Sequence, residues 1–201
     1  MSVLDIHVLG SPILRAETKV VTAVSDELRK LANDMFDTMY KAKGIGLAAP
    51  QVGRSERITV LDVDDQRFVL VNPEIVWEEG SERAEEGCLS IPDIYGEVDR
   101  AQRVLVRAID LEANPVELEA TDLLARCLQH EIDHLHGRLF IDYLSFLKRR
   151  AAIAKWETMR DKYPGLLRRT ALEVDSSDTT PASARADQGG GGTATGGGGA
   201  M

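Results

Sequence analysis

The chain has 201 residues, which is enough for one sizeable core but short for two full catalytic domains. Its hydrophobic fraction of 43% and charged fraction of 28% are those of an ordinary globular protein and exclude a fibrous class. The net charge of −9 argues against a general nucleic-acid binder, and the two cysteines, Cys88 and Cys127, exclude a disulfide scaffold. Because there is no run of about 18 apolar residues and residues 1–15 lack a signal-peptide pattern, we expect a cytoplasmic protein that spans no membrane.

The first predicted helix follows Ser25, which can cap it, and ends at Gly44. Apolar residues at helical spacing mark its core-facing side: Leu28, Leu31, Met35, Phe36 and Met39. Residues 44–53, GIGLAAPQVG, then form a predicted small apolar loop, and its glycines permit the close approaches that suit the side of a substrate cleft. The loop has neither GxGxxG spacing nor the Lys-Ser/Thr of a phosphate loop, which argues against nucleotide binding.

Two β-hairpins are predicted further along the chain. One joins residues 58–63 and 68–77, and the other joins residues 104–111 and 116–120. Between them, residues 86–92 (EGCLSIP) place Cys88 in a predicted glycine-flanked loop before a proline. Taken alone, such a cysteine is more often a small buried apolar residue than a metal ligand.

The most informative predicted helix covers residues 121–137, with Thr121 as its expected cap and Gly137 as its stop. Its few polar side chains fall on one narrow stripe that we expect to face solvent: Arg126, Gln129, Asp133 and His136. The rest of the helix must then face protein. This inward-facing remainder includes His130, Glu131 and His134.

Residues 130–134 form an HExxH motif, in which the two histidines lie one helical turn apart and can share one metal ion. Glu131 can reach a water beside that ion without being a ligand, as a general base requires. The alternative is that these are surface residues of an ordinary helix. Burying them without partners would cost ~1–3 kcal/mol or more each, and a metal removes that penalty, so we favour the metal site.

A catalytic metal site needs a third protein ligand and an open position. Downstream candidates are poor, because His136 follows His134 by two positions and points off the metal face, and Glu157 is the one acid that stands out in the next helix. We therefore expect the third ligand upstream, at Cys88. Cys127 lies on the inward face of the helix but cannot easily bend back to the metal, and we interpret it as pocket wall.

A last helix is predicted from about residue 143 to residue 163, and Pro164-Gly165 ends it. Its expected apolar positions are Leu144, Leu147, Ala151, Ala154 and Met159. It is the one strongly basic element of the chain, through Lys148, Arg149, Arg150, Lys155, Arg160 and Lys162, with Arg168 and Arg169 beyond it. We expect one folded domain at residues 1–165 and a disordered Ser/Gly-rich tail at residues 173–201.

Three segments together resemble the signature motifs of peptide deformylases in order and separation: GIGLAAPQVG at 44–53, EGCLSIP at 86–92 and QHEIDHLHG at 129–137. The similarity runs from about residue 4 to residue 160. It implies an α+β fold with antiparallel strands around a central HExxH helix. It also implies a bacterial enzyme that hydrolyses the N-formyl group of the formyl-methionine that begins newly synthesised proteins, releasing formate.

The resemblance also assigns roles. Metal ligands would be Cys88, His130 and His134; Glu131 would be the acid/base, and the Gln51 side chain and the Leu89 backbone amide would donate to the formyl oxygen. Substrate-binding positions would be Gly44, Ile45, Gly46, Leu123 and Cys127. The family's habit further suggests that Glu86 pairs with Arg100 to brace the cysteine loop. One thiolate and two imidazoles accept Zn, Ni, Co or Fe(II), and the resemblance favours Fe(II).

Two other functions fit parts of the pattern. An HExxH metallopeptidase would need a third His or Glu ligand, and a binding module with a structural zinc would need four protein ligands. The expected partners are N-formylmethionyl peptides and nascent chains. Because some deformylases dock on the ribosome through a C-terminal helix, the basic helix is a candidate docking element; the alternative is an amphipathic helix with a solvated basic face.

Overall fold

The computed structural model describes residues 2–170, and the predicted tail at residues 173–201 lies outside this range. The α-helices are α1 (Asp26–Lys41), α2 (Asp122–Leu135) and α3 (Phe146–Met159). The strands are β1 (Ile6–His7), β2 (Gly46–Ala48), β3 (Ile58–Val63), β4 (Gln66–Glu79), β5 (Glu82–Cys88), β6 (Ile91–Arg100), β7 (Arg103–Ile109), β8 (Pro115–Thr121) and β9 (Leu167–Arg168). Short 3-10 helices connect them: η1 (Pro12–Arg15), η2 (Ala49–Val52), η3 (Phe140–Tyr143), η4 (Arg160–Lys162) and η5 (Pro164–Leu166).

The strands form antiparallel sheets. One sheet has the order β2-β3-β4-β7-β8, while β5 pairs with β6 and β1 pairs with β9. The predicted hairpins are confirmed as β3–β4 and β7–β8. Together with the helices, these sheets confirm a mixed α+β fold.

Helix α1 covers one side of the β2–β3 end of the sheet with its apolar residues. Its predicted cap is confirmed, because the Ser25 hydroxyl accepts a hydrogen bond from the Leu28 amide at 3.2 Å. Thr121 precedes α2 as predicted, but its hydroxyl donates to Asp122 at 2.8 Å and does not cap the helix.

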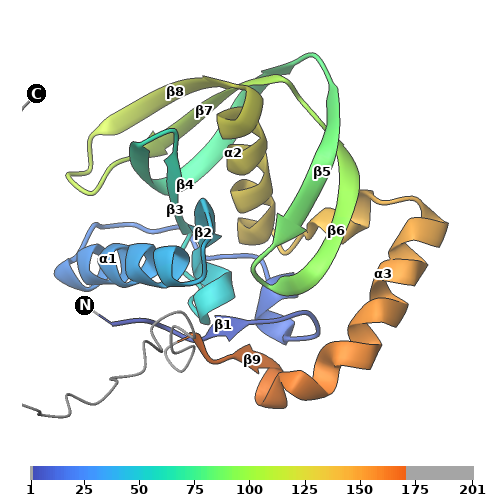
Figure 1. Ribbon diagram of the computed structural model, residues 1–201. Coiled ribbons are helices and arrows are strands. Elements are labelled where there is room, and N and C mark those ends of the chain that lie inside the picture. Colours follow the sequence, from blue (N-terminus) through green and yellow to red (C-terminus); the bar gives the residue numbers. More distant parts are fainter. Residues whose placement is uncertain (1, 171–201) are drawn as a thin grey trace, which may run out of the picture.

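Helix α2 lies between the five-stranded sheet and the β5–β6 hairpin (Figure 1). Its side chains Ala125, Leu128 and Ile132 pack into the core cluster that contains Leu61 and Val104 of the sheet. The opposite flank of α2 faces the hairpin, whose end carries Cys88. This arrangement brings the second and third sequence motifs together.

The predicted solvent stripe of α2 is wrong at three of its four positions, whereas the fourth, His136, is partly exposed. Arg126, Gln129 and Asp133 are only 8%, 6% and 5% exposed. The β5–β6 hairpin and the residues that follow it cover this flank and supply polar partners; for example, Gln129 exchanges two hydrogen bonds of 2.9 Å with the backbone of Ala101. These residues are polar because they hydrogen-bond to the covering segment inside the protein.

Two predicted loops contain regular structure. Residues 86–92 belong to the β5–β6 hairpin, whose first strand was missed because its sequence, ERAEEGC, is almost entirely polar or small. Residues 44–53 contain β2 and η2, and Gly53 ends η2 with a left-handed φ of 78°. Neither β5 nor β2 alternates apolar and polar residues clearly enough to be predicted from periodicity.

Helix α3 is shorter than predicted, and its buried face matches the predicted one only in part. Leu144 and Met159 pack into the core as predicted, and Ala152 and Trp156 join them beside β6 and η3, whereas Leu147, predicted to face the core, is 74% exposed. The packing of Trp156 into this core cluster therefore determines which side of α3 faces the protein. Within residues 2–170, no helix is both long enough and apolar enough to cross a membrane.

Candidate metal centre

Cys88, His130 and His134 converge at one point. Their ligand-type atoms all lie within 4.8 Å of one another, and the Cys88 sulfur lies 3.2 Å from Nε2 of His134. The two histidines follow each other by one turn on α2, and the cysteine comes from the end of β5. Three such atoms, one thiolate sulfur and two imidazole nitrogens, are the donors of a single-ion site, in which each would lie about 2.0–2.3 Å from the metal.

The donor set fits a divalent metal ion on two further grounds. One thiolate and two imidazoles suit ions such as Fe(II), Zn, Ni or Co. In addition, Oε2 of Glu131 is buried without a hydrogen-bond partner among the described residues, as is Nδ1 of His134, the ring nitrogen that does not face Cys88. Burial holds the pKa of His134 well below its ordinary value, so this imidazole is neutral and has a lone pair to donate.

Glu131 lies beside the donor set and is buried. This burial raises the pKa of Glu131 to about 7. A carboxyl group with a pKa near neutrality can both accept and return a proton. Gly46 makes room for it, because a Cβ at that position would lie 2.5 Å from Oε1 of Glu131.

The Gln51 side chain is fixed from both ends. Its Oε1 accepts a hydrogen bond from the Ala48 amide at 2.8 Å, which turns its amide nitrogen toward the cysteine turn. There Nε2 donates to the Ser90 hydroxyl at 3.2 Å and lies 3.6 Å from the Cys88 sulfur. Gln51 therefore presents N–H donors beside the donor set.

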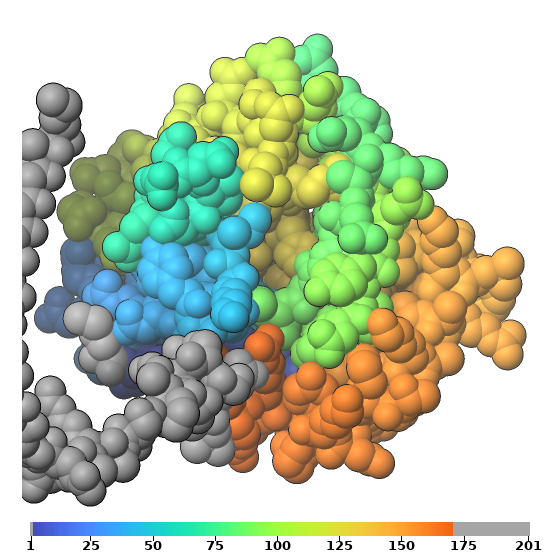
Figure 2. Space-filling model, viewed as in Figure 1, coloured from blue at the N-terminus to red at the C-terminus, as the bar shows by residue number. Residues whose placement is uncertain are grey.

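A cleft of about 670 Å³ opens beside these residues. Figure 2 shows the hollow between the light-blue segment near residue 45 and the green β5–β6 hairpin. Its lining includes these predicted site residues: Gly44, Ile45, Gly46, Gln51, Cys88, Leu89, Leu123, Cys127, His130 and Glu131. Ile45 and Leu123, at 44% and 49% exposed, lie at its rim, whereas His134 is fully buried behind it.

Some lining residues were not predicted. Tyr95 comes from β6, and Tyr163 and Arg168 come from the segment after α3. That segment reaches the cleft because β9 pairs with β1, a contact between chain ends that no local pattern predicts. The basic residues after Pro164 were noted in the sequence, but nothing linked them to a cleft.

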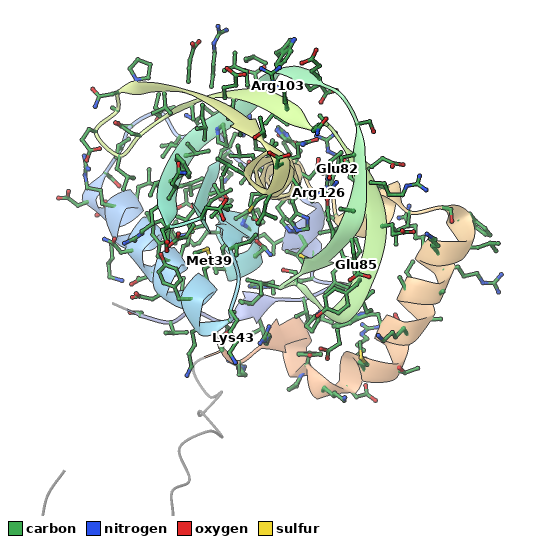
Figure 3. The ribbon with its side chains drawn as sticks, turned by 45° about the horizontal axis from the view of Figure 1, so that its top comes forward. Met39, Lys43, Glu82, Glu85, Arg103 and Arg126 are labelled. Atoms are coloured by element: carbon green, nitrogen blue, oxygen red, sulfur yellow. The ribbon has the colours of Figure 1, made fainter. Side chains whose placement is uncertain are left out.

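A buried ionic cluster adjoins His130. Glu86 accepts hydrogen bonds from Arg100 at 2.9 and 3.1 Å, which confirms the predicted pair, and from Arg126 at 2.8 Å. Arg126 also donates to the Glu82 carbonyl at 2.7 Å, and Figure 3 shows its side chain at the hairpin near Glu82. Sequence reasoning missed Arg126 because it was assigned to solvent.

The cluster keeps the carboxyl group of Glu86 ionised. Burial opposes its ionisation, but the hydrogen bonds with His130 and Arg100 outweigh burial and lower the pKa of Glu86 to about 2. Oε2 of this carboxylate lies 3.0 Å from Nδ1 of His130. An ionised carboxylate only accepts, so Nδ1 carries the proton and Nε2 is left for a metal.

Comparison with known proteins decides the family. Residues 3–150 match the sequence model of polypeptide deformylases. The chain belongs to the peptide deformylase family. A peptide deformylase of Alkalilimnicola ehrlichii is 51% identical over 163 residues, which cover 79% of this chain and 92% of the relative.

Solved structures of peptide deformylases agree with this family assignment. The crystal structure of a peptide deformylase from Legionella pneumophila has a TM-score of 0.77 at 46% identity, covering 80% of this chain and 97% of that one. A peptide deformylase from Synechococcus elongatus, in complex with actinonin, has a TM-score of 0.74 at 44% identity, covering 77% and 88%. The predicted family and activity are thereby confirmed: the enzyme is a metal-dependent hydrolase that removes the N-formyl group from nascent peptides. The metallopeptidase and structural-zinc alternatives are set aside.

Proposed function

We propose that Cys88, His130 and His134 hold the catalytic metal ion of this enzyme, and that Glu131, Gln51 and the Leu89 amide carry out formyl hydrolysis. The observation that carries the proposal is the buried Glu131 Oε2, which lacks a partner among the described residues and lies beside a convergent thiolate and two imidazoles. A water molecule at that point would satisfy the carboxylate and would be the nucleophile.

The metal ion, when bound, supplies a Lewis acid that acidifies water and polarises the formyl oxygen. We propose Fe(II), which the family resemblance favours over the chemically acceptable Zn, Ni and Co. A ferrous ion beside the Cys88 thiolate makes the site sensitive to oxygen.

Glu131 moves the proton. Its Oε2 accepts a proton from the attacking water as oxygen bonds to the formyl carbon, and its pKa near 7 suits this step. Glu131 then delivers the proton to the methionine nitrogen as the C–N bond breaks. The products are formate and a free amino terminus.

Gln51 and Leu89 stabilise the developing negative charge. Gln51 is held through Oε1 by the Ala48 amide and through Nε2 by Ser90, and its Nε2 donates to the formyl oxygen. The Leu89 backbone amide donates from the turn between β5 and β6. Loss of one donor of this kind costs ~2.7–4 kcal/mol of transition-state stabilisation in comparable sites.

The methionine side chain takes the apolar part of the cleft. Ile45, Leu123 and Cys127 line it next to His130, while Gly44 and Gly46 let the peptide backbone approach closely. An added Cβ at Gly44 would lie 2.7 Å from the Leu89 side chain, so this edge has no room for a larger residue.

The cellular setting completes the proposal. We place the enzyme in the bacterial cytoplasm, where it acts on nascent chains, with α2 as the helix around which its strands are arranged. The basic residues of α3 are proposed to dock on the ribosome. Lys148 and Arg149 are already paired with Glu97 and Asp142, at 2.8 and 3.0 Å, so exposed Arg150 on α3 and Lys162 on the adjoining η4 are the better probes.

One preparation tests the catalytic proposal. The protein is purified without oxygen, its metal content is measured, and formate release from formyl-Met-Ala-Ser is compared with peptide-bond hydrolysis of the unblocked peptide. We expect a bound divalent ion, formate from the formylated peptide and no cleavage of the unblocked one. Activity that survives complete removal of metal would contradict the proposal.

A further inference from the structure

Tyr143 ends η3, outside the cleft and beyond the three sequence motifs. Its hydroxyl donates a hydrogen bond of 2.8 Å to Oδ1 of Asp133. Its ring also covers the Arg100 guanidinium, whose Cζ lies 4.4 Å from the ring centroid. One side chain thus contacts two buried charged groups, Asp133 and Arg100.

From Tyr143, a continuous series of side-chain contacts leads to the metal centre. Oδ2 of Asp133 accepts from Nη1 of Arg100 at 2.5 Å. Nε and Nη2 of Arg100 donate hydrogen bonds to the two carboxylate oxygens of Glu86. Oε2 of Glu86 lies 3.0 Å from Nδ1 of His130 and accepts a hydrogen bond from it. Asp133, Arg100 and Glu86 are all buried, so water does not replace these bonds.

The geometry of Arg100 depends on Tyr143. Glu86 fixes one edge of the guanidinium, Asp133 fixes the remaining nitrogen, and the Tyr143 ring closes one face. Arg126 also donates to Glu86 at 2.8 Å, so without a firmly placed Arg100 the carboxylate can turn toward Arg126 and away from His130. The orientation of the imidazole follows from that of Glu86.

We propose that Tyr143 is a positioning residue for the metal ligand His130, acting through Asp133, Arg100 and Glu86. The inference rests on the proposed function, because it takes His130 to be a ligand. Outer-shell partners of this kind typically change metal affinity by ~10–100-fold, and a contact this far from the ion belongs at the lower end of that range.

The test measures metal release, which is independent of catalysis. Wild type, Tyr143→Phe and Tyr143→Leu are loaded with Ni(II), and transfer of the ion to a chromogenic chelator is followed over time. We expect release from Tyr143→Leu to be roughly tenfold faster than from wild type, with Tyr143→Phe in between because it keeps the ring.

Tyr40→Phe is the matched control. Tyr40 is also 44% exposed and its hydroxyl also bonds an aspartate, Asp62, but it lies on α1 away from the ionic cluster. Its release rate should equal that of wild type. Melting temperatures of all variants show whether each is folded.

A double-mutant cycle separates positioning from a general structural role. In a Glu86→Gln background the pathway is already broken, so adding Tyr143→Leu should change release little further. The peptide KM of Tyr143→Leu should stay at the wild-type value when metal is saturating, because Tyr143 does not line the cleft.

The proposal is overturned if Tyr143→Leu releases metal at the wild-type rate, or if it accelerates release equally with and without Glu86. A lower melting temperature with unchanged release also overturns it. Failure of the proposed function looks different: His130→Ala would then release metal no faster than wild type.

Discussion

Oε2 of Glu86, on strand β5, lies 3.0 Å from Nδ1 of His130, on helix α2. This bond joins the hairpin that carries Cys88 to the helix that carries both histidines. Because Glu86 is ionised, it directs the proton to Nδ1 and leaves Nε2 of His130 for a metal. The donor set is therefore assembled by the packing of the hairpin against α2.

Cys88→Ser is expected to weaken metal binding strongly, whereas Cys127→Ser should leave it near the wild-type value. A hydroxyl is a much poorer ligand than a thiolate for these ions, and Cys127 is pocket wall, contacting the Ile45 carbonyl at 3.8 Å. Metal content after dialysis distinguishes the variants. Equal loss of metal in both would remove the distinction between the two cysteines.

Metal is expected to stabilise the folded chain, because the convergent ligands exist only in the folded state. At a free ion concentration of about 100 times the dissociation constant, the gain in unfolding free energy is about 2.7 kcal/mol. Urea unfolding of metal-free protein with and without Ni(II) measures it. His134→Ala should abolish most of the gain; if it does not, the ion binds elsewhere.

Gly46→Ala is expected to lower activity severely, because its Cβ would lie 2.5 Å from Oε1 of Glu131 and 2.8 Å from the Cys127 sulfur. Displacement of Glu131 should reduce kcat, while Cys88, His130 and His134 keep the metal. The measurement is formate release at matched metal content. An alanine variant with wild-type kcat would show that Glu131 tolerates displacement.

Asp142 should give a pH-dependent contribution to stability. Burial opposes its ionisation, but hydrogen bonds from Arg15 and the Leu139 amide, with Arg149 nearby, hold the pKa of Asp142 below its ordinary value of 3.8. Its stabilisation is therefore complete above about pH 4 and is lost as the pH falls through the folded-state pKa.

We expect Asp142→Asn to lower the unfolding free energy by about 1 kcal/mol at pH 7, and the difference from wild type to shrink below pH 4. Urea unfolding at pH 7, 5, 4 and 3.5 measures this, with Asp37→Asn, a half-buried position without an ion pair among the described residues, as the control. A difference that stays constant down to pH 3.5 would exclude ionisation as the cause.

Local patterns predicted what depends on local chemistry. The HExxH spacing gave the two histidines and Glu131 on one helix, and Ser25 gave the start of α1, because both follow from helix geometry. Contacts between distant segments were beyond such patterns. Arg126 and Asp133 were assigned to solvent, since their partners Glu86 and Arg100 lie on a hairpin whose first strand reads as polar.

The cleft shows the same division. The motif resemblance identified the residues around the cysteine and the histidines. Tyr163 and Arg168 reach the cleft because β9 pairs with β1, where Arg168 lies opposite Ile6, 162 residues (168 − 6) earlier in the chain. Pairing over such a distance depends on the whole fold.

The most direct test of the account compares Glu131→Gln with wild type in the same anaerobic preparation, measuring metal content and formate release together. The amide cannot accept a proton from water, whereas Cys88, His130 and His134 are unchanged. We predict equal metal content and a fall in formate release of at least ~10²-fold, the usual size of a general-base contribution. Formate release within a few-fold of wild type, or loss of metal together with activity, would contradict the assigned roles.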